Sequence, residues 1–85
     1  MDSMKIAIYS MEQTLFEGQA EKVIAQTPMG EIAVLNGHLP MISAICAPSV
    51  AIITAHGERT TIALVDGILE VRPESEIVIL ANETE

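Results

Sequence analysis

The stretch from residue 28 to residue 40 reads PMGEIAVLNGHLP. Its centre, Ile32–Leu35, is an apolar run of strand length, and a turn signal lies on each side of it. Gly30, before the run, is free to adopt a positive φ. The segment Asn36–Pro40, after the run, is a second turn-rich loop. The stretch therefore predicts one β-strand between two exposed turns.

The same rhythm extends in both directions along the chain. Turn signals recur at intervals of about 6–12 residues, which is the spacing of a sandwich or barrel of short strands. Ile and Val make up eighteen of the 85 residues, and β-branched side chains suit a pleated sheet. We expect an all-β chain, with strands at Lys5–Ser10, Thr14–Phe16, Gln19–Gln26, Glu31–Leu35, Met41–Cys46, Ala51–Ala55, Arg59–Val65, Ile68–Val71 and Ile77–Leu80.

Two of these strands are apolar at both parities, whereas a strand with one solvated face should alternate. The runs are Met41–Cys46 and Val50–Ala55. One interpretation places them in the centre of the fold, covered on both faces. The other makes them a surface patch of small apolar residues that another protein covers. The pattern alone leaves both interpretations open.

Composition bounds the kind of protein. The chain has 85 residues and 9.1 kDa, which predicts a single domain over residues 1–85. A net charge of −8 argues against nucleic acid or an anionic membrane as the direct ligand. Pro40 and Pro48 interrupt the longest charge-free run, so we expect no membrane-spanning helix and no lipid insertion. The N-terminus lacks the pattern of a signal peptide, which favours a cytoplasmic protein.

Chemical motifs are scarce. The five glycines fit neither a dinucleotide-binding fingerprint nor a P-loop. His38, His56 and Cys46 lie at none of the usual metal-ligand spacings, and Cys46 sits in an apolar strand where a thiol is normally inert. We therefore predict no catalytic, cofactor-binding or metal-binding residue. Two alternatives stay open, namely a stand-alone β-sandwich that binds a peptide or small ligand, and a small metal or thiol enzyme that uses these three residues.

Three segments carry a resemblance to a known family. Thr14–Gly18, Gly30–Ile32 followed by Gly37–Pro40, and Asp66–Val71 occur in the order and spacing found in the ε subunit of the F-type ATP synthase. The chain resembles the N-terminal β-sandwich domain of that subunit over nearly its whole length. The resemblance implies a two-sheet antiparallel β-sandwich of about nine to ten short strands.

Some residues depart from the family's usual pattern. Asn36 stands where proline is most common, and Leu39 stands where alanine is usual. Residues 65–67 read Val-Asp-Gly in place of the more usual Ser-Gly-Gly. The sequence ends at Glu85, where most members continue into an α-helical hairpin, so that hairpin and its roles are not carried over.

The resemblance implies a non-catalytic rotor subunit that joins the γ subunit to the membrane c-ring, without a cofactor of its own. It also implies a peripheral position on the cytoplasmic face of the bacterial plasma membrane. Gly30 and Glu31 would contact the polar loops of the c-ring. The residues that would contact γ or the ring are His38, Leu39, Pro40, Met41, Ile42 and Ser43.

Overall fold

The computed structural model describes residues 3–83, and every regular element in that range is a β-strand. The prediction of an all-β chain is confirmed. The strands are β1 (Met4–Tyr9), β2 (Thr14–Ala20), β3 (Lys22–Thr27), β4 (Gly30–Leu35), β5 (Met41–Ile53), β6 (Arg59–Ala63), β7 (Asp66–Arg72) and β8 (Glu76–Asn82). Residues 3–83 contain no helix that is long and apolar enough to cross a membrane. The predicted domain also includes residues 1–2 and 84–85, which lie outside the described part.

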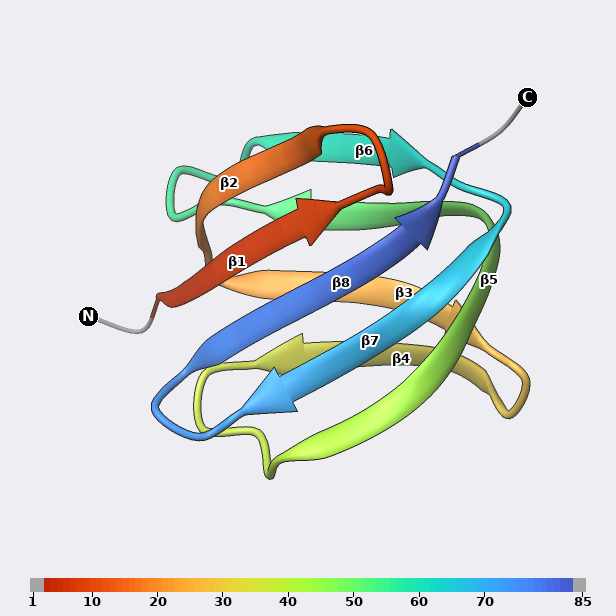
Figure 1. The fold of residues 1–85 in the computed structure, drawn as a ribbon. Coiled ribbons are helices and arrows are strands. Elements are labelled where there is room, and N and C mark those ends of the chain that lie inside the picture. The colour runs from red at the N-terminus through yellow and green to blue at the C-terminus, as the bar shows by residue number, and fades with distance from the viewer. Residues whose placement is uncertain (1–2, 84–85) are drawn as a thin grey trace.

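The strands form one hydrogen-bonded sheet in the order β2-β1-β8-β7-β5-β3-β4, with β6 attached to β5. The sheet folds over on itself, so that β7 and β8 lie in front of β3 and β4 (Figure 1). β1 and β8 run parallel, whereas the other neighbouring pairs are antiparallel. The expectation of a wholly antiparallel fold is therefore wrong at this pair. Its register places Ile6 beside Ile77 and Ile8 beside Ile79, which aligns the buried faces of the first and last strands.

The described residues form eight strands, one fewer than the nine predicted, because β5 spans two of the predicted strands. The first half of β5, Met41–Cys46, pairs with β7, and the second half, Ser49–Ile53, pairs with β6. β3 pairs with residues of both halves. One long strand therefore joins the two layers. Pro48 predicted a break between two strands, yet it lies at a bulge where the register with β3 shifts. A bulge accommodates proline because no ladder hydrogen bond is required there. The chain therefore bends at Pro48 and continues as the same strand.

The boundary between β2 and β3 also differs from the prediction. The predicted strands Thr14–Phe16 and Gln19–Gln26 place a break at residues 17–18, but Gly18 pairs with Ile6 and lies near the ring of Phe16. The break falls instead at Glu21, whose N–H donates to the carbonyl of Ile53 at 2.8 Å. The pairing with Ile6 therefore keeps Gly18 within β2.

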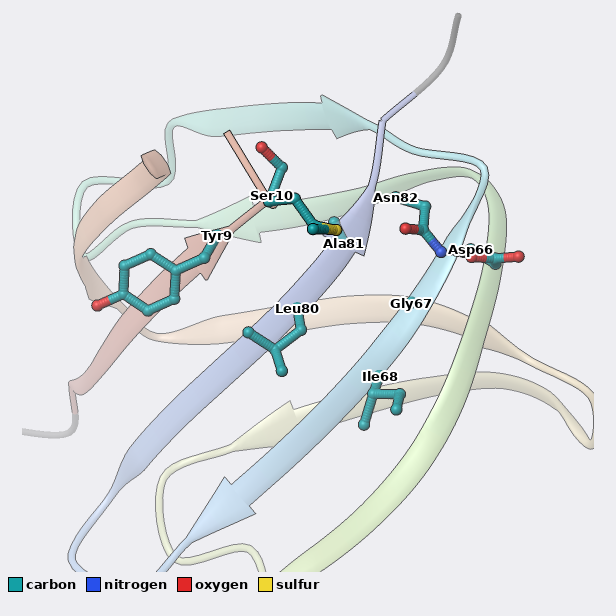
Figure 2. Close-up of a pocket in the computed structure, with 9 residues that line it drawn as sticks. Tyr9, Ser10, Asp66, Gly67, Ile68, Leu80, Ala81 and Asn82 are labelled. Atoms are coloured by element: carbon teal, nitrogen blue, oxygen red, sulfur yellow. Dashed lines mark hydrogen bonds between the residues drawn. The ribbon is translucent and has the colours of Figure 1, made fainter. Parts of the chain in front are cut away.

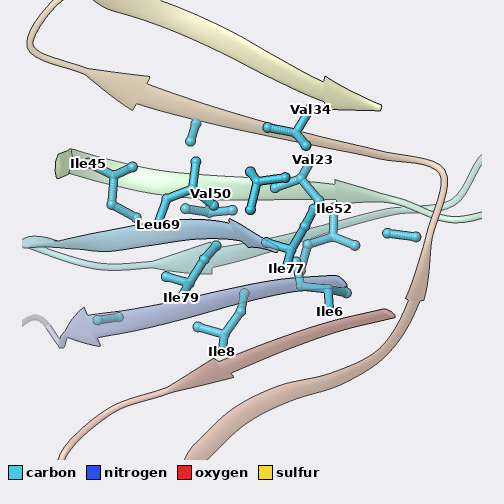
Figure 3. Close-up of a cluster of buried hydrophobic side chains, with 14 of the residues drawn as sticks. Ile6, Ile8, Val23, Val34, Ile45, Val50, Ile52, Leu69, Ile77 and Ile79 are labelled. Carbon is cyan, nitrogen blue, oxygen red and sulfur yellow. The ribbon is translucent and has the colours of Figure 1, made fainter. Parts of the chain in front are cut away.

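The core between the layers is aliphatic (Figure 3). Ile6, Ile8, Ile77 and Ile79 project from β1 and β8 toward the side chains of β3, β4 and β5. Burying such a side chain stabilises the fold by about 1.5–3 kcal/mol. Buried and less buried residues alternate along β7, where Leu69 is buried and its neighbours on either side are not. The outward faces are therefore the surfaces available to partners.

Candidate partner-binding surfaces

The β3–β4 hairpin has a tip that is fixed by one buried hydroxyl. Thr27 Oγ1 donates to the carbonyl of Gly30 at 2.8 Å and accepts from the N–H of Met29 at 3.1 Å. Thr27 is only 8% exposed. Gly30 has a φ of +117°, which other residues rarely adopt, so the expectation of a positive φ here is confirmed. The tip is thus a rigid projection.

Two side chains of different character stand on this tip. Met29 is 95% exposed, and Glu31 is also exposed. Glu31 Oε1 accepts a hydrogen bond from Gln26 Nε2 at 3.0 Å, across the strand pair. That contact restrains the carboxylate while it stays in solvent. The tip therefore offers one flexible apolar group and one positioned negative charge.

The loop at residues 36–40 lies at the other end of β4. His38, Leu39 and Pro40 are all exposed, and Leu39 is 79% exposed. His38 N–H donates to the carbonyl of Leu35 at 3.0 Å, and its ring Nδ1 lies 2.7 Å from the carbonyl of Leu39. A carbonyl can only accept, so Nδ1 carries the proton in this contact. The histidine organises the loop, and Leu39 is presented to solvent.

The next three predicted residues divide between the two faces of β5. Ile42 points outward and is 72% exposed. Met41 and Ser43 are half-buried on the inward parity, and Met41 packs against the core. The side chain of Ile42 can therefore contact a partner directly, while those of Met41 and Ser43 support the strand from within.

An apolar patch, only part of which lies in the predicted run Met41–Cys46, covers the outward face of four strands. Its central row runs across β5, β7, β8 and β1, because the register aligns Ala44, Ile68, Leu80 and Tyr9. Ile68 is 50% exposed and Leu80 is 56% exposed. Figure 2 shows the side chains of Tyr9, Leu80 and Ile68 on one side of the sheet. Together with the next row, we define the outer patch as Tyr9, Ile42, Ala44, Ile68, Val78 and Leu80.

The outer patch also contains and borders polar side chains. The register places Glu70 between Ile42 and Val78, and Arg72 Nε lies 3.2 Å from Glu70 Oε1. At the opposite border, Asn82 hydrogen-bonds Asp66. The sequence indicated this patch only weakly. Its one sign was the presence of apolar residues, such as Ile68 and Leu80, at outward positions where an alternating strand usually has polar residues.

Gly67 lets β7 and β8 approach closely beneath this patch. A Cβ atom at position 67 would lie 2.4 Å from the carbonyl oxygen of Leu80, a contact that real Cβ atoms do not make. Only glycine therefore fits between Asp66 and Ile68 without moving the backbone of β8.

The two doubly apolar runs turn out to differ from each other. In the first, Ile42 and Ala44 are exposed, as the surface interpretation requires. In the second, Val50, Ala51 and Ile52 are all buried, although consecutive residues point to opposite faces. This half of β5 is a central strand between β3 and β6. The central interpretation holds for Val50–Ile52, which are therefore unavailable to a partner, whereas Ala55 at the end of the run is exposed.

The three residues of the metal or thiol alternative do not converge. His38 lies in the β4–β5 loop, His56 lies in the β5–β6 loop, and Cys46 lies within β5 with its Sγ 3.6 Å from the carbonyl of Gln26. Within the part of the chain that the structure describes, no three His, Cys, Asp or Glu side chains group as metal ligands. The candidate functional features are therefore surfaces for contact with other proteins. The hairpin tip at Gly30 and the loop at His38 lie at opposite ends of β4, and the length of that strand separates them by about 17–20 Å.

Comparison with known proteins agrees with this geometry. The family described as "ATP synthase, Delta/Epsilon chain, beta-sandwich domain" matches residues 3–85. The ATP synthase epsilon chain of Xanthomonas oryzae pv. oryzae is 36% identical over 87% of this chain and 53% of its own length. The epsilon chain of Ruminococcus albus is 34% identical over 100% of this chain and 63% of its own length. This chain thus spans between half and two thirds of the length of these relatives.

Solved structures share the fold at low sequence identity. A chain in the Euglena gracilis mitochondrial ATP synthase (OSCP/F1/c-ring) has a TM-score of 0.87 and 17% identity, over 95% of this chain and 51% of that one. A chain in the central stalk and c-ring of the Tetrahymena thermophila mitochondrial ATP synthase has a TM-score of 0.76 and 9% identity, over 94% of this chain and 63% of that one. The family match covers nearly all of the sequence, and this chain belongs to the β-sandwich domain family of the ATP synthase delta and epsilon chains.

Proposed function

We propose that this chain is a non-catalytic central-stalk subunit of an F1Fo ATP synthase. It links the γ subunit to the membrane c-ring, so that proton or sodium transport is coupled to ATP synthesis or hydrolysis. Membership of the delta/epsilon family supports this role. The two structural neighbours belong to an OSCP/F1/c-ring assembly and to a central stalk with its c-ring, which supports it further.

The observation that carries the proposal is a pair of contact surfaces that differ in chemistry and in position. The outer patch and the loop at residues 36–40 form a broad apolar surface with Leu39 and Ile42 at its exposed border. The hairpin tip with Met29 and Glu31 lies at the far end of β4. A subunit that bridges two partners needs two separate surfaces of this kind.

The apolar surface is assigned to γ. Specific stable interfaces bury about 800 Å² on each partner and have an apolar centre with a polar rim. The outer patch reaches from β1 to β5, and its second row contains Glu70, which pairs with Arg72, between Ile42 and Val78. Apolar burial of this type holds two proteins together at physiological salt, as a permanent rotor contact requires.

The hairpin tip is assigned to the polar loops of the c-ring. Gly30 gives the tip its shape, and Glu31 supplies a negative charge that suits arginine-bearing ring loops. An exposed ion pair is worth about 0–1 kcal/mol. The Glu31 contact would therefore add to the contacts with γ rather than hold the subunit by itself.

A rotor part must resist deformation, and the described residues share one hydrophobic core. We infer that the two layers act as a two-sheet β-sandwich, formed by β2-β1-β8-β7-β5 and β6-β5-β3-β4 and joined through β5. Side chains packed at crystalline density between the layers would transmit force with little compression. We also infer that residues 1–85 behave as one domain.

The proposed location is the cytoplasmic face of the bacterial plasma membrane, as a peripheral part of the complex. The net charge of −8 disfavours direct contact with anionic lipid. Contacts with γ and the ring, rather than with lipid, would hold the subunit there.

The test is co-purification with the γ subunit of the same organism. We expect a stoichiometric complex that withstands gel filtration, and no ATP hydrolysis by this chain alone. Failure to bind γ at micromolar concentrations would overturn the assignment of a rotor subunit.

A further inference from the structure

The turn between β7 and β8 holds two consecutive residues in a conformation that their side chains disfavour. Glu74 has a φ of +66° and Ser75 has a φ of +59°, in the left-handed region that Gly and Asn adopt most readily. Such residues persist only where their surroundings hold them, and they are frequent at functional positions.

Ser75 uses both of its polar groups to contact other elements. Its carbonyl accepts from the N–H of Lys5 at 2.9 Å, which ties the turn to β1. Its hydroxyl donates to Oδ1 of Asn36, a residue 39 positions earlier in the chain. The left-handed backbone of the turn therefore coincides with a serine that bridges two other segments. Figure 1 shows this turn and the β4–β5 loop at the same end of the molecule.

Asn36 occupies a sensitive position in that loop. It lies inside the turn that the hydrogen bond from His38 N–H to Leu35 carbonyl closes at 3.0 Å. Gly37, the next residue, has a φ of +87°. Holding the Asn36 side chain restricts the conformations open to this residue, which is the first central residue of the turn that leads to Leu39.

The loop and the turn also border the same surface hollow. Its lining includes Pro40 and Ile42 from one side and Arg72 and Pro73 from the other. A partner that covers Ile42 would therefore meet residues of both segments. The relative position of the two segments matters for such a partner.

We propose that Ser75 and Asn36 are positioning residues that hold the loop at residues 36–40 in its partner-binding shape. This inference rests on the proposed function, because it assumes that the loop contacts γ. The hydroxyl of Ser75 orders the Asn36 side chain before binding, so that γ does not have to order the loop itself. A preordered loop binds more tightly because less conformational entropy is lost on association.

Substitutions at positions 36 and 75 can remove the hydrogen bond between the two side chains without removing the backbone hydrogen bonds of the turn. Ser75→Ala and Asn36→Ala each remove the side-chain contact and leave the backbone bond from Lys5 N–H in place. Ser75→Gly also relieves the positive φ, so its thermal stability should equal or exceed that of the wild type. Glu74→Gly is the matched control, because it relieves the same kind of φ and keeps the hydroxyl of Ser75.

The first measurement is amide hydrogen exchange in the isolated protein. We expect Asn36→Ala and Ser75→Ala to accelerate exchange at His38 by about 2- to 10-fold, the factor set by one hydrogen bond, and to leave the core amide of Leu69 unchanged. Glu74→Gly should leave His38 exchange at the wild-type rate. Unchanged exchange at His38 in both alanine variants would overturn the positioning role.

The second measurement is affinity for purified γ. The two alanine variants and Ser75→Gly should bind about 2- to 10-fold more weakly, and the double variant Asn36→Ala/Ser75→Ala no more weakly than either single variant. Asn36→Asp keeps the acceptor oxygen and should bind like the wild type, as should Glu74→Gly. Faster exchange with unchanged affinity would overturn the assignment of the loop to γ. If wild-type protein fails to bind γ, the proposed function falls, while the exchange data still decide the positioning role.

Discussion

The sharpest prediction concerns the three large aliphatic side chains of the outer patch. Replacing Ile or Leu by Ala removes three carbons, and each buried methylene is worth about 0.8 kcal/mol. Because Ile42 is 72% exposed, a partner that covers it would gain about 1.7 kcal/mol from those carbons. Leu80 at 56% and Ile68 at 50% would contribute about 1.2–1.3 kcal/mol each. The triple alanine variant should therefore bind γ about 1000-fold more weakly, and each single variant about 8- to 18-fold more weakly.

The assay is isothermal calorimetry or surface binding with purified γ at physiological salt. Only part of each side chain is buried in the isolated chain, so the free energy of unfolding should fall by only about 0.7–1.2 kcal/mol per substitution. Leu35→Ala is the matched control, since Leu35 is 50% exposed but lies on β4, outside the outer patch. If the triple variant binds γ as the wild type does, the outer patch is not the γ surface.

Other predictions follow from single contacts. Gly67→Ala should lower the free energy of unfolding by about 1–3 kcal/mol, because the new Cβ would lie 2.4 Å from the carbonyl oxygen of Leu80. Thermal unfolding measures this loss, and wild-type stability would contradict the close approach of β7 and β8. Thr27→Val should cost about 1–3 kcal/mol in urea unfolding because it removes both hydrogen bonds of the hairpin tip; an unchanged midpoint would refute that account. Glu31→Gln should reduce ATP-driven ion pumping slightly and Glu31→Arg more strongly, through repulsion by ring arginines, while Glu74→Arg leaves pumping unchanged. Wild-type pumping by Glu31→Arg at low salt would refute the ring contact. The complex with γ should survive about 0.5 M salt, because apolar burial is not screened.

The all-β class and most strand positions were accessible from the sequence because they depend on local patterns. Turn residues such as Gly30 and Asn36 interrupt the chain wherever the backbone must reverse, and alternation separates inward residues from outward ones within a strand. The family resemblance was accessible for the same reason, because its segments are turns and strand starts. The exposed positions of Glu31 and Leu39 followed from their place in turns.

Only the tertiary structure decided which outward residues share a surface. Tyr9, Ala44, Ile68 and Leu80 are scattered over the sequence, and the register between four strands brings them into one row. Packing of the whole core sets that register. It also sets the parallel pairing of β1 with β8 and the continuity of β5 through Pro48. The contact between Ser75 and Asn36 depends on the same packing. Periodicity along one strand carries no information about its neighbours, so these features appear only when the chain is folded.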